Sequence, residues 1–254
     1  MPAVFSSESS AATGLITSPQ ARVLVSGGAI FAGDRFKPAT LPSLCGFYGA
    51  CRRIALILHA THPDDRDATE QRFRAAFGAV NPKAELTSLH HYDRPDALQF
   101  LSEADGIFIG GGETFGLLRA LYAAGQIEML RERVLAGVPT GGTSAGANVM
   151  GPLIGTTNDF PVTDVPTRRA LSVFPTLINP HHPLPSRAND FETRAAKIGH
   201  YLQWNPGERV LALADASTAI LAAGRVSVAL GPAWLYEAGA LGISLREGDL
   251  VSLG

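Results

Sequence analysis

Short continuous runs of apolar residues alternate, in the N-terminal half of the chain, with segments whose apolar residues recur at helical spacing. The continuous runs are typical of strands buried on both faces, and they lie at residues 21–28, 54–59 and 106–109. Residues 84–89 are a further strand candidate. The helical segments lie at residues 66–78, 94–103 and 115–124. This alternation predicts an α/β fold with a mostly parallel central sheet that helices cover on both faces.

The pattern changes in the C-terminal part of the chain. Residues 191–202 have the spacing of an amphipathic helix. Short apolar runs separated by glycine-containing turns follow it, at residues 210–215, 219–221, 226–230 and 233–236. Such runs predict β-hairpins toward the C-terminus.

Length and composition indicate one globular unit. The chain has 254 residues, of which 46% are hydrophobic and 17% are charged, enough for one substantial core. We therefore expect a single domain over residues 21–254. Residues 1–20 are rich in Ser and Ala and lack the basic start and apolar core of a secretory signal, so we expect a flexible tail there.

The charge balance narrows the class of partner. A net charge of −2 gives no basic footprint for nucleic acid, and no apolar run is long enough to cross a membrane. A small molecule is the favoured partner. The only cysteines, Cys45 and Cys51, are expected to be reduced thiols without a function, which indicates a cytoplasmic protein. Either a monomer or a homodimer is compatible with the sequence.

The clearest chemical signal is the pattern Gly142-x-Ser144-x-Gly146 between a predicted strand and a predicted helix. In a nucleophile elbow a serine occupies a sharp strand-to-helix turn, and its neighbours are small because backbone and substrate approach closely. Ser144 is the candidate nucleophile, and the N–H of Ala145 is a candidate oxyanion donor at the start of the helix. A glycine-rich turn without chemistry is the alternative.

A second glycine loop follows the strand at residues 106–109. Gly111 and Gly112 are candidates for the other half of an oxyanion hole, because glycine lets backbone N–H groups face a ligand. Acyl-transfer sites often take one donor from the residue after the nucleophile and one from a separate loop. A purely structural turn is the alternative. The earlier pair Gly27-Gly28 is expected to be structural, since no complete phosphate-binding pattern follows it.

Two pairs of adjacent histidines, His90-His91 and His181-His182, are candidates for further chemistry. Neither pair has a cysteine or carboxylate at zinc-ligand spacing, so we expect no metal. A general base is the better use of His181 or His182, because imidazole accepts a serine proton near neutral pH. Asp215, at the end of a predicted strand, is either a turn residue or the carboxylate that orients a histidine.

Five ordered segments together resemble one family. They are residues 109–115, 144–148, 156–161, 177–181 and 192–194. The sequence resembles the peptidase E family, the aspartyl dipeptidases, which are related to cyanophycinases. The resemblance implies a serine peptidase on a class I glutamine amidotransferase-like fold, without a cofactor.

The resemblance also assigns roles residue by residue. The nucleophile of the family falls on Ser144, its histidine on His181 and an essential aspartate on Asp159. Asp215 falls where members of the family have glutamate, and it would complete the triad by holding the imidazole tautomer. Glu113 stands where asparagine is common in similar proteins, and it adds a charge beside the site.

The implied reaction is hydrolysis of dipeptides or short peptides with an N-terminal aspartate, through an acyl-enzyme. A carboxylate and an ammonium must then be recognised. Arg194 is the candidate cation, because a guanidinium binds a carboxylate bidentately. Asp159, Glu113 and Asn158 are the other candidate substrate-binding residues.

Other functions are compatible with the same residues. A cyanophycinase-like or isoaspartyl peptidase is the main alternative. An esterase is a lesser one, since α/β-hydrolases place the acid before the histidine, whereas the order here is Ser144, His181, Asp215. A catalytically inactive binding module is disfavoured by the intact Ser144 and His181.

Overall fold

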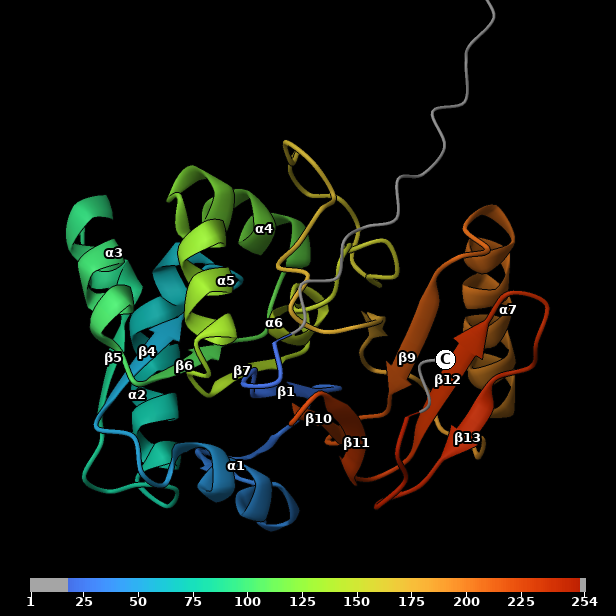
Figure 1. The fold of residues 1–254 in the computed structure, drawn as a ribbon, viewed down its shortest axis with the longest axis horizontal. Helices are drawn as coiled ribbons and strands as arrows, with labels where there is room; N and C mark the ends of the chain where they lie inside the picture. The colour runs from blue at the N-terminus through green and yellow to red at the C-terminus, as the bar shows by residue number, and fades with distance from the viewer. Residues whose placement is uncertain (1–17, 252–254) are drawn as a thin grey trace, which may run out of the picture.

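The computed structural model describes residues 18–251, so most of the tail expected over residues 1–20 lies outside the described residues. A seven-stranded sheet forms its centre, in the order β11-β10-β1-β7-β6-β4-β5 (Figure 1). Its parallel strands are β1 (Val23–Ser26), β7 (Thr140–Thr143), β6 (Gly106–Ile109), β4 (Arg53–Ile57) and β5 (Glu85–Ser88). The antiparallel strands β10 (Thr218–Ala222) and β11 (Arg225–Leu230) complete one edge.

Helices cover both faces of this sheet, as the alternating pattern predicts (Figure 1). One face packs on α1 (Leu41–Tyr48) and α2 (Arg66–Phe77). The other packs on α3 (Arg94–Glu103), α4 (Thr114–Ala123), α5 (Gln126–Leu135) and α6 (Ala145–Asn148). Successive strand residues serve opposite faces: Leu24 contributes to the first core, and Val23 and Val25 to the second. Within residues 18–251 no helix is long and apolar enough to cross a membrane.

A second, four-stranded sheet has the order β13-β12-β9-β8. It consists of β8 (Leu177–Asn179), β9 (Arg209–Leu213), β12 (Ala233–Glu237) and β13 (Ile243–Leu245). Helix α7 (Ala188–Trp204) packs on it through Ile198 and Leu202. Strands β8 and β9 are parallel, so their carboxyl ends lie at the same edge.

The predicted α/β fold class is confirmed, with one refinement in the C-terminal part. Strands β10 and β11 form an antiparallel pair, and so do β12 and β13. Strands β9 and β10, although close in sequence, belong to different sheets. Helices α1 and α5 and strand β8 were not predicted from the sequence. The last is only three residues long and lies between Pro175 and Pro180, a setting that favours a loop prediction.

Candidate active site

Ser144 occupies the turn between β7 and α6 with φ 54° and ψ −117°, a conformation that non-glycine residues rarely adopt. The glycines around it are required by close backbone packing. A Cβ on Gly142 would lie 2.3 Å from the carbonyl oxygen of Gly146, and a Cβ on Gly146 would lie 2.1 Å from that of Ile109. The turn therefore has the backbone of a nucleophile elbow.

His181 and Asp215 come to Ser144 from the second sheet. His181 follows β8 and Asp215 follows β9, and these strands are parallel neighbours, so both residues emerge at one edge. Ser144 Oγ lies 2.8 Å from His181 Nε2, and His181 Nδ1 lies 2.6 Å from Asp215 Oδ1. The His181 and Asp215 side chains are 43% and 59% exposed, so this pair is open to solvent.

The pair Gly27-Gly28, at the end of β1, joins the two sheets at this point. The carbonyl of Gly27 accepts a hydrogen bond from the N–H of His181 at 2.8 Å, and that of Gly28 accepts one from Ala216 at 2.7 Å. Gly28 has φ 111°, and a Cβ there would lie 2.1 Å from Cε1 of His181. The glycine turn thus holds the backbone on both sides of the His181–Asp215 contact.

Of the three residues predicted to form an oxyanion hole, Ala145 follows Ser144 in the chain and Gly111 lies against it. A Cβ on Gly111 would lie 3.0 Å from Cβ of Ser144, so the two residues touch. Gly112 has φ 139°, and a Cβ there would lie 2.2 Å from the carbonyl oxygen of Ala60. Ala145 begins α6, where an N–H has no partner within the helix.

A pocket of about 360 Å³ opens beside Ser144 and His181. Helix α2 lines its other side with Thr69, Arg72 and Phe73. Arg72 donates two hydrogen bonds to the carbonyl of Gly33, and its guanidinium lies 4.2 Å from the centre of the Phe31 ring. No motif spacing pointed to Arg72; its position just before a buried phenylalanine of α2 was the only signal available.

Two of the predicted substrate residues bind the start of α4. Oδ2 of Asp159 accepts hydrogen bonds from the N–H and the hydroxyl of Thr114, at 2.8 and 2.5 Å. Within residues 18–251, Oδ1 of Asp159 has no hydrogen-bond partner. Both carboxylate oxygens of Glu113 accept backbone bonds, from Phe115 and Gly116. The charge added by Glu113 therefore stabilises the helix N-terminus.

Asn158 and Arg194 lie in a second pocket, of about 200 Å³, whose lining includes neither Ser144 nor His181. Asn179 links them: its side-chain amide donates to Oδ1 of Asn158 at 3.0 Å, and its Oδ1 accepts from Arg194 at 3.2 Å. Asn158 also donates to the carbonyl of Pro180, directly before His181. Among the described residues no carboxylate forms an ion pair with Arg194.

His182, the other histidine of this pair, points away from Ser144. It is 2% exposed and packs against the rings of Phe191 and Trp234. Its Nε2 lies 3.0 Å from the hydroxyl of Tyr236, and its Nδ1 lies 2.9 Å from the carbonyl oxygen of Pro183. Burial lowers the pKa of His182 to about 4.

This buried imidazole predicts a loss of stability in mild acid. Between about pH 6.5 and pH 4, His182 is protonated in the unfolded chain but stays neutral in the folded chain. The free energy of unfolding therefore falls as the pH drops through this range. We expect the contribution of His182 to the loss to be about 2 kcal/mol between about pH 7 and pH 5. Urea unfolding of the wild type and of His182→Gln at both pH values measures it.

The exposed His200 provides the control for that measurement. His200→Gln should keep the wild-type pH dependence, whereas His182→Gln should reduce it by about 2 kcal/mol. His59, whose pKa burial also lowers to about 4, keeps its own contribution in every variant. Equal pH dependence in all three proteins would contradict the assignment to His182. The titration of the His182 ring in an NMR spectrum of the wild type gives the same answer without a substitution.

Proteins of known family resemble this chain in sequence and in fold. Residues 23–228 match the family model for Peptidase family S51. The chain is 38% identical to Peptidase E of Shewanella sp. (strain W3-18-1) over 162 residues, which is 63% of this chain and 67% of that protein. It is 32% identical to Peptidase E of Pasteurella multocida (strain Pm70) over 212 residues, 82% of this chain and 88% of that protein. The crystal structure of a peptidase from an acI-B1 Actinobacterium shares the fold, with a TM-score of 0.67 at 18% identity, covering 92% of this chain and 97% of that one.

Proposed function

Since the chain belongs to Peptidase family S51 and is a serine-type peptidase, we propose that it hydrolyses dipeptides or short peptides with an N-terminal aspartate. The observation that carries the proposed chemistry is the unbroken contact chain from Ser144 Oγ through His181 to Asp215, at 2.8 and 2.6 Å. Those are the distances at which a nucleophile, a base and an orienting carboxylate act together.

In the proposed reaction Nε2 of His181 removes the hydroxyl proton of Ser144 as Oγ attacks the peptide carbonyl. The carboxylate of Asp215 accepts a hydrogen bond from Nδ1–H of His181 and stabilises the imidazolium that forms. The same proton then passes from Nε2 to the leaving amine, which departs and leaves an acyl-enzyme on Ser144. Water, deprotonated by His181, attacks the ester carbonyl; the bond to Oγ of Ser144 breaks, His181 returns the proton to Oγ, and the N-terminal amino acid is released.

The tetrahedral intermediates carry a negative oxygen that needs donors. The N–H of Ala145 and an N–H from Gly111 or Gly112 are the proposed donors, because Ala145 follows Ser144 and Gly111 lies against it. A helix N-terminus favours negative charge at the first of these positions.

The choice of aspartate is proposed to rest on one cation and one anion. Arg194 is half-buried, and burial lowers the pKa of its guanidinium; an anionic ligand would compensate a cation removed from water. It is linked through Asn179 and Asn158 to the backbone before His181. Oδ1 of Asp159 is the proposed acceptor for the substrate ammonium.

A dipeptide panel scored by mass spectrometry tests this function. Asp-X, Glu-X, Asn-X and β-Asp-X dipeptides are compared at equal concentration. We expect Asp-X to be cleaved fastest. Equal cleavage of Asn-X would exclude the aspartyl assignment in favour of a broader peptidase, and faster cleavage of β-Asp-X would favour the isoaspartyl alternative.

The role of Arg194 predicts a specific change in selectivity. Arg194→Met should reduce the preference for Asp-X over Asn-X more than it reduces Asn-X turnover. The expected loss is about 2–3 kcal/mol of discrimination, as for a charge pair whose partner is truncated. Arg194→Lys should also weaken it, because a point charge does not reproduce the bidentate fork. The kcat/KM ratio for the two substrates measures each effect.

Arg72→Met is the matched control, since Arg72 is the cation that lines the Ser144 pocket itself. We expect that variant to retain most of the Asp-X preference. If the kcat/KM ratio of Asp-X to Asn-X is unchanged in Arg194→Met but falls to near one in Arg72→Met, Arg72 is the residue that binds the substrate carboxylate.

A further inference from the structure

A cluster of metal-ligating side chains lies on the far side of α2 from the Ser144 pocket. It consists of Asp67, Glu70, His90 and His91, and one candidate ligand atom from each lies within 4.8 Å of all the others. We propose that these four residues bind a divalent transition-metal ion of the Zn²⁺ class. The proposal does not depend on the peptidase chemistry proposed above.

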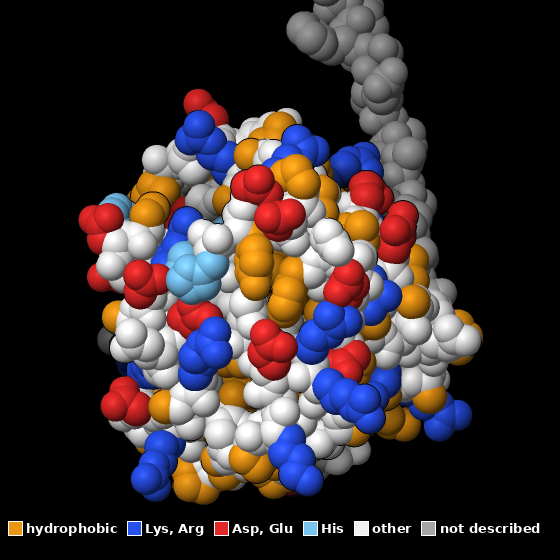
Figure 2. Space-filling model, turned by 90° about the vertical axis from the view of Figure 1, so that its left-hand side faces the viewer, with side chains coloured by type: hydrophobic (Ala, Val, Ile, Leu, Met, Phe, Trp, Pro, Cys, Tyr) orange, Lys and Arg blue, Asp and Glu red, His pale blue; other side chains and the backbone are white. Residues whose placement is uncertain are grey.

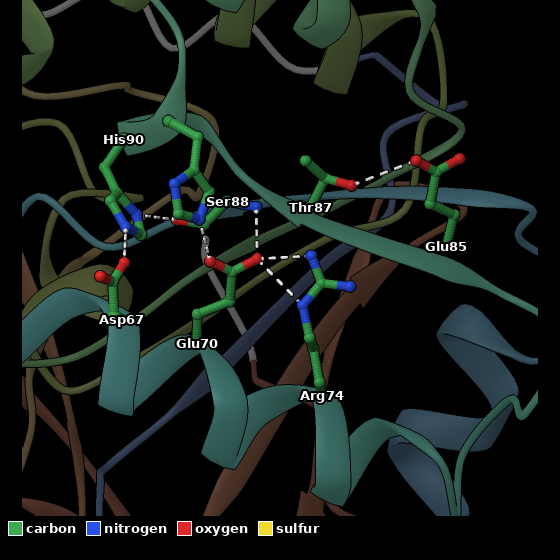
Figure 3. Close-up of polar contacts among 8 residues, drawn as sticks. Asp67, Glu70, Arg74, Glu85, Thr87, Ser88 and His90 are labelled. Carbon is green, nitrogen blue, oxygen red and sulfur yellow. Dashed lines mark hydrogen bonds and ion pairs between the residues drawn. The ribbon is translucent and has the colours of Figure 1, made fainter.

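Local structure explains why the four side chains meet. Strand β5 ends at Ser88 and passes into the 3-10 turn Leu89–His91. In a strand, adjacent side chains point to opposite faces, but this turn brings the two histidine rings to the same side, with centroids 4.0 Å apart. Asp67 and Glu70 lie on one face of α2, which faces the turn (Figure 3).

The contacts within the cluster pair each imidazole with a carboxylate. Nε2 of His90 lies 2.9 Å from Oδ1 of Asp67, and Nε2 of His91 lies 2.5 Å from Oε2 of Glu70. These nitrogens and oxygens are the atoms that a metal ion would take as ligands in place of the protons they now share.

In His90 and Glu70, the side-chain atom that is not a candidate ligand forms hydrogen bonds with neighbouring groups, as is common for metal ligands. Nδ1 of His90 lies 2.6 Å from the hydroxyl of Ser88, which leaves Nε2 for the metal. Oε1 of Glu70 accepts hydrogen bonds from Arg74 and from the N–H of Ser88, which leaves Oε2 for the metal (Figure 3). Such partners set the tautomer and the orientation of a ligand.

Two of the four side chains are largely buried and two are exposed. The side chains of Glu70 and His90 are only 5% and 11% exposed, whereas those of Asp67 and His91 are 77% and 47% exposed. In a tetrahedral zinc site the ligand atoms lie about 3.4 Å apart, given bonds of about 2.0–2.1 Å. Because the candidate ligand atoms lie within 4.8 Å of one another, their separations have to change by about 1.4 Å or less, and the exposed pair has the freedom to make most of that change.

The donor types favour a transition metal over Mg²⁺ or Ca²⁺. Two imidazole nitrogens and two carboxylate oxygens suit Zn²⁺ and its borderline neighbours, whereas the hard cations select all-oxygen sites. A pocket of about 280 Å³, lined by Asp67, Glu70, Gln71, Arg74 and His91, gives an ion access from solvent. Figure 2 shows this side of the molecule, where a histidine lies at the surface among acidic and basic side chains.

A metal at this position would tie α2 to the end of β5. The opposite face of the same helix carries Thr69, Arg72 and Phe73, which line the pocket beside Ser144. The ion would therefore act as a structural clamp on a wall of that pocket, and its binding is measured without any peptide substrate.

The experiment is a calorimetric titration of the full chain with Zn²⁺ after treatment with a chelator. We expect one equivalent per chain, a rise in Tm on binding, and the visible absorption of a nitrogen- and oxygen-liganded Co²⁺ when cobalt replaces zinc. His91→Ala, which alters an exposed ligand, should weaken binding by more than about a hundredfold, and Ser88→Ala by about 10- to 100-fold.

His62→Ala is the matched control, because His62 is an exposed histidine 3.6 Å from a single carboxylate, that of Asp64. It should bind Zn²⁺ as the wild type does, and so should His181→Ala, which removes the histidine that faces Asp215. Zinc binding that persists unchanged in His91→Ala, or that disappears in His181→Ala, would overturn the proposal. So would a wild-type titration without saturable binding or any change in Tm, which would leave the cluster as a hydrogen-bond network.

Discussion

Replacing Ser144 with alanine is expected to lower kcat by about 10⁴- to 10⁶-fold, while the chain stays folded. Without Oγ no acyl-enzyme forms, and the residual rate comes from substrate binding and from the oxyanion donors alone. Alanine is compatible with the turn, because Ser144 already has a Cβ at φ 54°. Steady-state hydrolysis of an Asp-X dipeptide measures the loss, and thermal melting confirms that the variant is folded.

The contact between Ser144 and His181 makes a second test of the same assignment. Residues that act as one unit have non-additive effects, so Ser144→Ala, His181→Ala and the double variant should all show similar residual rates. A serine-directed phosphonate should label the wild type at Ser144 and should not label Ser144→Ala. Retention of more than about a tenth of wild-type turnover in Ser144→Ala would exclude Ser144 as the nucleophile.

Much of the central sheet was predictable because strands such as β4 and β6 are short, mainly apolar runs that alternate with helices of clear periodicity. Residues 106–109 and 94–103, for example, were predicted with the bounds that the structure has for β6 and α3. The turn at Ser144 was equally clear, since glycines at two fixed offsets are needed for close backbone packing. Local signals of this kind depend only on neighbours in the sequence.

Contacts between segments that are far apart in the sequence could not be predicted from such local signals. The carboxylates that face His90 and His91 come from α2, about twenty residues earlier, and no ligand spacing connects them. The connection between β9 and β10 contains Asp215 and runs from the four-stranded sheet to the central sheet. In the sequence it resembles the turn of a β-hairpin. Its true path depends on pairing with β12 and β1, which only the assembled fold reveals.

The Gly27-Gly28 turn, expected from the sequence to be structural, lies directly against His181. Gly28→Ala is expected to reduce kcat/KM by about 10²- to 10⁴-fold. The lower bound is the cost of misplacing a catalytic group by about 1 Å, and the upper bound is the loss of a triad member. The physical reason is that the new Cβ would lie 2.1 Å from Cε1 of His181, so the ring has to leave its place between Ser144 and Asp215.

Backbone strain has to be separated from this steric effect, because Gly28 also has φ 111°, where alanine is unfavourable. Gly224→Ala is the control: Gly224 has φ 71° in the β10–β11 turn, and a Cβ there meets nothing within 4 Å. Both variants should lose stability through strain, by about 1 kcal/mol or more, but only Gly28→Ala should lose activity per folded molecule. The two effects are measured by kcat/KM scaled to the folded fraction and by the rate of phosphonate labelling at Ser144. Near-wild-type labelling of folded Gly28→Ala would mean that the imidazole does not need the position it has here, and the proposed His181 base would have to be abandoned.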